Sequence, residues 1–209
     1  MATASRMSSE ERRGAILRAA VRLFAERGFR GTTTRALAKA VGVTEPVLYE
    51  HFKSKHDIYR AIIEAKSRDG LARGTALLKP YAEAGDDRAF FTRLAEHVLE
   101  SHGAQAGQYA RLLLYAALED PALGALFHER QKEGRELLAR YIARRIREGA
   151  FRRTDPALAA RAFLGMGVHL GLLELLYHDD FVGGRRKQVV EGLVEIFLNG
   201  MTQDREGAR

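Results

Sequence analysis

Apolar residues recur every three or four positions along almost the whole chain, and this period predicts helices throughout. The first apolar stripe consists of Ile16, Ala20, Leu23 and Phe24. Ser8 and Glu11 have the spacing of a capping box before this stripe, and Gly28 is a stop signal after it. No run of four or more alternating β-branched residues occurs, so the sequence predicts an all-α fold without a sheet.

Two short helices are predicted next, over residues 32–42 and 44–52, and each begins at a threonine. Gly42 ends the first one, because glycine readily adopts the left-handed conformation that closes a helix. Helices shorter than about 12 residues are marginal in water, so both must pack on the first helix and on each other. Leu48 and Phe52, four residues apart, anchor the second helix. This spacing is typical of a helix-turn-helix, although two short core helices without a ligand have the same pattern.

With Leu48 and Phe52 turned inward, the helix over 44–52 turns Pro46, Tyr49 and Glu50 outward. Proline in a first turn removes no helical hydrogen bond, and it presents a rigid apolar edge suited to a thymine methyl group. The side chains here that can donate to phosphate oxygens are Tyr49, His51, Lys53 and Lys55. Such a short, rigid helix is suited to a major groove. The alternatives are that the tyrosine is a half-buried packing residue and the histidine an ordinary surface residue.

The positive charge of the chain is concentrated near its N-terminus. The whole sequence has a net charge of +7, and residues 1–55 account for +6, with eleven lysines and arginines against five glutamates. This distribution indicates a module that binds a polyanion, joined to a nearly neutral body. A basic surface that is merely solvated is the simpler alternative.

The stretch GFRGTTTRALAKAVGVTEPVLYEHFKSKHDIY, residues 28–59, resembles the N-terminal domain of the TetR/AcrR family of bacterial transcription regulators. The resemblance covers about residues 10–60. It implies a sequence-specific regulator, a ligand-released repressor that binds a palindromic operator as a homodimer. It places Thr33 or Thr34 on a phosphate, Arg35 at a guanine, and Pro46 and Val47 at bases. The full set of residues expected at the DNA is Thr33, Thr34, Arg35, Thr44, Glu45, Pro46, Val47, Tyr49, His51, Lys53 and Lys55.

Glu45 departs from the family pattern, because many relatives carry a neutral or basic residue at this position. Its carboxylate can accept a hydrogen bond from a cytosine amino group, or it can simply favour the positive end of the helix. Both roles stay open at the level of the sequence.

The rest of the chain resembles the family only in its layout. A long helix is expected over 55–79, followed by a loop over 80–87. Further helices are expected over 88–102, 106–118, 122–148, 156–178 and 185–200, which gives about nine helices in all. The expected domains are a helix-turn-helix domain over 1–54, an effector-binding and dimerisation bundle over 55–201, and a disordered tail over 202–209.

The last two predicted helices are strongly apolar. The final one has an amphipathic face, and the one before it is apolar almost all round, so it must be buried on two sides. We expect a two-fold dimer interface here, a four-helix bundle from two chains. Its residues are Gly167, Leu170, Gly171, Val190, Val194 and Phe197. The alternative is that these helices close the core of a single chain.

Several polar or flexible side chains are set in otherwise apolar helices of the body. They are His97, Tyr109, Tyr115, Met166 and His169. Such groups can line a pocket for a small effector between helices, which the resemblance implies to be apolar. Each of them can equally be a satisfied core or interface residue.

Other classes of protein fit the sequence less well. There is no cysteine, and His97 and His102 are five residues apart instead of the four of a zinc-protease helix, so we expect no enzyme, no metal and no cofactor. No signal peptide is visible, so the expected location is the bacterial cytoplasm, at the nucleoid. Residues 157–177 contain Arg161, His169 and Glu174, which argues against a membrane span. The main alternative function is a non-specific, architectural DNA-binding protein.

Overall fold

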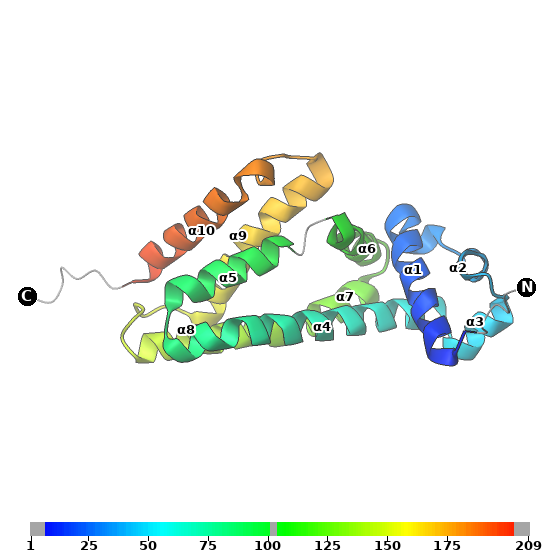
Figure 1. Ribbon diagram of the computed structural model, residues 1–209, viewed down its shortest axis with the longest axis horizontal. Coiled ribbons are helices and arrows are strands. Elements are labelled where there is room, and N and C mark those ends of the chain that lie inside the picture. The colour runs from blue at the N-terminus through cyan, green and yellow to red at the C-terminus, as the bar shows by residue number, and fades with distance from the viewer. Residues whose placement is uncertain (1–6, 101–103, 203–209) are drawn as a thin grey trace, which may run out of the picture. The chain divides into compact units, whose positions relative to one another are not determined.

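The computed structural model describes residues 7–100 and 104–202, apart from the side chains of residues 104–106 and 115. Within these residues the chain forms ten α-helices and one 3-10 helix and contains no strand; an isolated bridge pairs Phe151 with Thr202 (Figure 1). The all-α prediction is therefore confirmed, and about nine helices was close to the observed number.

The helices follow one another with short connections. They are α1 (Ser9–Gly31), α2 (Thr34–Val41), α3 (Glu45–His51), α4 (Lys55–Ala84), α5 (Asp87–Glu100), α6 (Ala104–Glu119), α7 (Pro121–Arg130), α8 (Lys132–Arg147), α9 (Pro156–Tyr177), η1 (Gly183–Arg185) and α10 (Arg186–Met201).

The described residues form two compact units. Residues 7–68 and 108–130 make the first unit, and residues 69–100, 104–107 and 131–202 make the second. Helices α7 and most of α6 thus pack with the N-terminal helices, although they lie far away in the sequence. The predicted domain boundary after residue 54 stays a prediction, as does the disordered tail, because residues 203–209 lie outside the described part of the chain.

The first unit is built around one apolar core, to which α1, α2, α3, α4, α6 and α7 all contribute. All four residues of the first predicted stripe are buried, and so are Leu37, Leu48, Phe52, Ile58 and Leu112. Burying such side chains stabilises the fold by roughly 1.5–3 kcal/mol each. The two short helices, which would not persist alone, are held in place by this core.

Local signals end the first two helices of this unit. Gly28 adopts a left-handed φ of 73° and puts a kink near the end of α1. Thr32 is fully buried at the corner that follows, and its hydroxyl lies 2.9 Å from the carbonyl oxygen of Gly28 and 3.1 Å from that of Leu23. Gly42, with φ 77°, closes α2 as predicted.

Two predicted boundaries are wrong. The loop expected over 80–87 is helical up to Ala84, so α4 continues through Pro80. The helix expected over 122–148 is two helices, α7 and α8, with a break at Gln131. Gln131 keeps nearly helical angles, φ −86° and ψ −8°, and neither glycine nor proline marks the break.

The second unit has a core rich in aromatic residues, contributed by α5, α8, α9 and α10. Phe91 lies at its centre and contacts the rings of Tyr141, Phe151, Phe163 and Phe197, with ring centroids 4.8–6.2 Å apart. The edge-to-face and tilted geometries are those that aromatic quadrupoles favour.

An ion pair at the edge of this core joins α5 to α8. The guanidinium of Arg145 donates two hydrogen bonds of 2.8 Å to the carboxylate of Asp87, and the hydroxyl of Tyr141 donates a third, of 2.6 Å. Burial raises the pKa of Tyr141, and the hydrogen bond to the Asp87 carboxylate raises it further. The pair is largely buried, and Arg145 also forms an ion pair with Glu148, so the loss of Asp87 would leave Arg145 with this more exposed partner alone.

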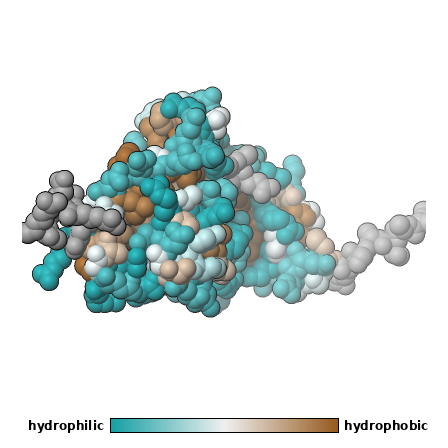
Figure 2. All heavy atoms as spheres, turned by 60° about the vertical axis from the view of Figure 1, so that its left-hand side comes forward, coloured by the Kyte–Doolittle hydropathy of each residue, from teal (hydrophilic) through white to brown (hydrophobic). Residues whose placement is uncertain are grey.

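Helix α9 is long and apolar enough to span a membrane by length and composition alone, and no other helix in the described part of the chain is. Ala159, Ala160 and Phe163 bury one of its sides in the core of the second unit. Leu158, Val168, Leu176 and Tyr177 are exposed on it. Figure 2 shows scattered apolar patches among the hydrophilic atoms of one face of the molecule.

Candidate nucleic-acid interface

Helix α3 is anchored by the two residues that the sequence predicts. Leu48 is completely buried and Phe52, which caps the helix, is 4% exposed. Arg13 of α1 holds the end of α3 from outside the core: its guanidinium lies 4.2 Å from the centre of the Phe52 ring, and it donates a 2.9 Å hydrogen bond to the carbonyl oxygen of His51. The orientation of α3 is therefore fixed by packing, a cation–π contact and a hydrogen bond.

The opposite side of α3 is open within its unit. Pro46 and Glu50 are exposed, and Tyr49 is 49% exposed, a large fraction for an aromatic side chain. Thr44, the residue before the helix, is exposed too, and Val47 is half-buried. The geometry that a groove-reading helix needs, with one side in the core and the other side accessible, is present.

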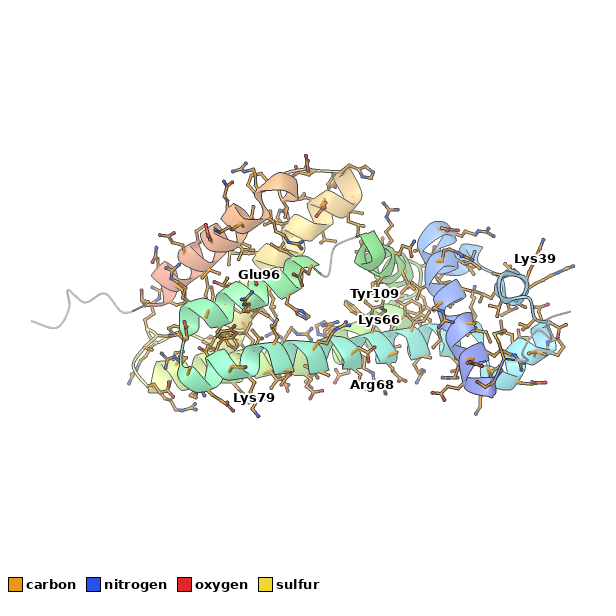
Figure 3. All side chains as sticks on the ribbon, in the orientation of Figure 1. Lys39, Lys66, Arg68, Lys79, Glu96 and Tyr109 are labelled. Carbon is orange, nitrogen blue, oxygen red and sulfur yellow. The ribbon has the colours of Figure 1, made fainter. Side chains whose placement is uncertain are left out.

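The N-terminal end of α2 offers one free donor. Thr33 caps this helix, since its hydroxyl oxygen accepts a 3.1 Å hydrogen bond from the amide of Ala36. The hydroxyl proton stays available for a phosphate oxygen. Arg35 is exposed two residues later, and Lys39, one turn further along α2, projects from the same helix (Figure 3). The sequence prediction omitted Lys39, although its spacing of four from Arg35 indicates the same side of the helix.

A chain of hydrogen bonds ties α2 to α3 on this surface. The hydroxyl of Thr34 donates a 2.7 Å bond to Glu45, and the hydroxyl of Tyr49 lies 3.4 Å from the oxygen of Thr34, which it can use as an acceptor. Glu45 therefore has a third role that the sequence did not indicate, as the acceptor that joins the first turns of the two helices. Because the hydroxyl of Thr34 already donates its hydrogen bond to Glu45, Thr33 is the better of the two threonines to donate to a phosphate.

The basic residues at the end of α3 and just after it differ in their exposure to solvent. Lys53 is exposed. The Nε2 atom of His51 is buried and has no hydrogen-bond partner in the described structure, so it does not face solvent as the predicted phosphate contact would.

Lys55 is occupied within the protein. Its ammonium group donates to the carbonyl oxygens of Phe29 at 2.7 Å and Thr32 at 2.9 Å, and it lies 4.4 Å from the centre of the Phe29 ring. Burial lowers its pKa, and the nearby charge of Glu119 opposes this shift. This geometry does not support the predicted phosphate contact; Lys55 satisfies the carbonyl groups of the corner after α1.

The six residues expected at a dimer interface instead lie against the core of the second unit. Gly167, Gly171, Val190, Val194 and Phe197 are buried there, and Leu170 packs against that core. A side chain at Gly167 would meet the Cγ1 atom of Val98 at 2.8 Å, which explains the need for glycine. These residues follow the alternative that the sequence left open, the closing of the chain's own core.

The residues expected at an effector pocket are distributed over both units. Tyr109 belongs to the first unit, where burial raises its pKa to about 12 and the nearby Ser67 hydroxyl opposes this rise; the hydroxyl of Tyr59 is buried without a hydrogen-bond partner among the described residues. His97 belongs to the second unit, where burial, with the charge of Arg73 as a smaller cause, lowers its pKa.

The other three residues expected at the effector pocket give less support for a pocket. Met166 packs against the core of the second unit, and His169 is exposed. The side chain of Tyr115 lies outside the described residues. The pocket therefore stays a prediction.

Comparison with family models gives two matches. Residues 16–62 match the model of the bacterial regulatory proteins of the tetR family, and residues 89–200 match the C-terminal domain of AefR-like transcriptional repressors. The second match alone covers more than half of the chain. Together the two matches include both the candidate interface and most of the body.

Curated relatives match parts of the chain. The HTH-type transcriptional activator FasR of Mycolicibacterium smegmatis is 39% identical over 70 residues, which is 34% of this chain and only 32% of that protein. The HTH-type transcriptional repressor KstR2 of Mycobacterium tuberculosis is 30% identical over 148 residues, 68% of this chain and 70% of that protein.

Solved structures match nearly the whole chain. The flavonoid-responsive regulator FrrA is 27% identical, with a TM-score of 0.72, over 93% of this chain and 98% of that one. AibR, solved with isovaleryl coenzyme A and operator DNA, is 24% identical with a TM-score of 0.63, over 89% of this chain and 97% of that one, and at this identity the likeness shows the fold alone.

Proposed function

This chain belongs to the tetR family of bacterial regulatory proteins, and from that premise we propose that it is a repressor that binds a palindromic operator as a homodimer and leaves it when a small effector binds. It is a DNA-binding transcriptional regulator and not an enzyme. The observation that carries the proposal is the exposed side of α3, opposite the buried Leu48 and Phe52. Its place of action is the bacterial cytoplasm.

Different residues of α2 and α3 contact the bases and the backbone of the DNA. Pro46 and Val47 meet base edges at the tip of α3, and Arg35 reads a guanine. Thr33 and Lys53 hold the DNA backbone, which fixes orientation without reading sequence. Tyr49 joins them by exchanging its long, 3.4 Å hydrogen bond to Thr34 for one to a phosphate oxygen. Lys39 joins this backbone group, since it is exposed on the same helix as Arg35.

Dimerisation uses the outer side of α9 and α10, not the side that the sequence prediction named. Leu158, Val168 and Leu176 of α9 are exposed, and so is Ile196 of α10, which is 68% exposed. Gly165 of α9 has nothing within 4 Å of where a side chain would begin, which leaves room for a close helix. Two-fold pairing then sets the half-sites roughly 34–36 Å apart, or a multiple of that distance.

The effector carries at least one hydrogen-bonding group in addition to apolar surface. The buried hydroxyl group of Tyr59, which has no hydrogen-bond partner among the described residues, supports this, because an unpaired buried hydroxyl costs about 1–3 kcal/mol. A ligand changes DNA binding only through unequal affinity for two conformations, and a shift from 1:99 to 99:1 requires about 5.5 kcal/mol of difference. KstR2 is named a repressor and FrrA a flavonoid-responsive regulator, and these names guide the proposal.

Selection of bound duplexes from a random pool tests the proposal. The purified protein is mixed with random double-stranded DNA, the bound fraction is recovered over several rounds and sequenced, and the mass of the complex on the recovered duplex is measured. We expect a palindrome and two or more chains per duplex. A pool that stays random over all rounds would favour the non-specific, architectural alternative.

A further inference from the structure

The corner between α1 and α2 sets how the DNA-binding helices are held, and it needs partners from outside α1 and α2. The chain turns at Gly28 and reaches the cap of α2 at Thr33. Such a turn leaves backbone groups without helical partners, and each must find another one. The carbonyl groups near this corner are satisfied by the hydroxyl of Thr32 and by Lys55, the first residue of α4.

A backbone amide of the same corner has its hydrogen-bond acceptor in Glu119, the last residue of α6. Its carboxylate accepts a 2.7 Å hydrogen bond from the amide of Arg30, and the guanidinium of Arg30 donates a 2.9 Å bond to the carbonyl oxygen of Glu119. The carboxylate also occupies the space beside Gly28, since a side chain there would begin 2.5 Å from the Oε1 atom of Glu119. Three contacts thus converge on one glutamate, 89 residues from its partner in the sequence.

The next residue strengthens the same contact. Asp120 lies 2.9 Å from the Nε2 atom of His56 at the start of α4, and its other oxygen accepts from the amide of Ala122 to cap α7. The hydrogen bond from His56 is the main reason why the pKa of Asp120 is lowered. The ring of His56 lies against Phe29 with centroids 4.8 Å apart. The corner between α6 and α7 therefore holds both the end of α1 and the beginning of α4.

We propose that Glu119 is a positioning residue for DNA binding: by holding the α1–α2 corner at Gly28 and Arg30, it keeps α2 and α3 in the orientation that fits DNA. This inference rests on the proposed function, since it assigns Glu119 a role in holding the same DNA-binding site.

The sign of the effect separates this role from simple electrostatics. Glu119 is an acid in a positively charged unit, so charge alone predicts that its removal strengthens binding to polyanionic DNA. The positioning role predicts the opposite, weaker binding to the operator. The matched control is Glu26→Ala, which removes one exposed acid from α1 in the same unit.

The experiment compares the full-length wild type, Glu119→Ala, Glu119→Gln and Glu26→Ala. For each, hydrogen exchange of the Arg30 amide is measured in the free protein, and operator affinity is measured on the selected duplex. In Glu119→Ala we expect the Arg30 amide to exchange at least about tenfold faster and the operator affinity to fall about tenfold, which corresponds to about 1.4 kcal/mol. Glu119→Gln keeps an acceptor oxygen and should lie between this variant and the wild type.

The control should exchange like the wild type at Arg30 and bind DNA equally well or slightly better. The proposal is overturned if Glu119→Ala binds the operator as tightly as Glu26→Ala does, or if its Arg30 amide exchanges at the wild-type rate. If Glu119→Ala does not fold, Glu119→Gln decides by the same two readings. A wild type that does not discriminate the operator would refute the proposed function instead, and the exchange of Arg30 would still report on the contact.

Discussion

Replacing Lys55 by methionine should destabilise the fold and leave the salt dependence of DNA binding unchanged. The ammonium group makes two hydrogen bonds, of 2.7 and 2.9 Å, to backbone carbonyl oxygens and a cation–π contact with Phe29. A hydrogen bond to a charged group contributes about 1.5–3 kcal/mol when buried, but this site is partly solvated. We therefore expect a loss of about 2 kcal/mol in the free energy of unfolding, or roughly 4–8 °C in Tm for a chain of this size.

Lys53→Met is the matched comparison, because this exposed lysine lies only two residues away. It should leave Tm unchanged and reduce the slope of log K against log salt by about 0.9 for each protomer, or about 1.8 for a homodimer on one operator, because each protomer loses one phosphate contact. Urea unfolding and salt-series titrations on one operator duplex measure both quantities for both variants. A Lys55→Met protein with wild-type stability and a salt slope reduced by this amount would refute the role given to Lys55 here.

Three further predictions concern separate parts of the molecule. Tyr49→Phe should weaken binding to operator and random DNA alike, whereas Arg35→Ala should also relax sequence preference by about 1–3 kcal/mol at one base pair, as titrations on single-base variants of the operator can measure. Asp87→Ala should cost about 1–3 kcal/mol in urea unfolding, because Arg145 keeps only its ion pair with the more exposed Glu148 and the Tyr141 hydroxyl loses its acceptor. The pKa of His97 is lowered in the folded state, so below about pH 6.5 the unfolded chain binds more protons than the folded one. The free energy of unfolding should therefore decrease as the pH is lowered below this value, and it should decrease less in His97→Gln.

The DNA-binding helices were predictable because their signals are local. Helix α2 begins after Thr33 and ends at Gly42 because of the backbone conformations of these two residues. Helix α3 is anchored by Leu48 and Phe52, which are four residues apart. The contact of Glu45 with Thr34 was not predictable, because it depends on how the two helices cross. For the same reason the sequence could not tell whether Lys55 faces DNA or the carbonyl groups of its own corner.

The continuation of α4 through Pro80 depends on tertiary contacts. Proline removes a hydrogen bond from a helix, so the sequence favours a break there. In the structure, Leu78, Tyr81 and Ala82 pack against the core of the second unit, and the guanidinium of Arg144 binds the carbonyl oxygen of Ala82. These contacts hold the last turn of the helix.

The choice of face on α9 was also beyond the sequence. This helix is apolar almost all round, so periodicity cannot distinguish the side that enters the chain's own core from the side that stays exposed on it. In the structure Phe163 and Gly167 are buried, and Leu158 and Leu176 are exposed.

We propose that the exposed side of α3, with the N-terminal end of α2, reads the sequence of DNA. The ratio of affinities of the wild-type protein for its selected operator and for a shuffled duplex of the same composition, measured at the same salt concentration, tests this directly. We expect a ratio of about 10³ or more, with steep salt dependence on both duplexes. A ratio near one, with the same steep salt dependence, would contradict it.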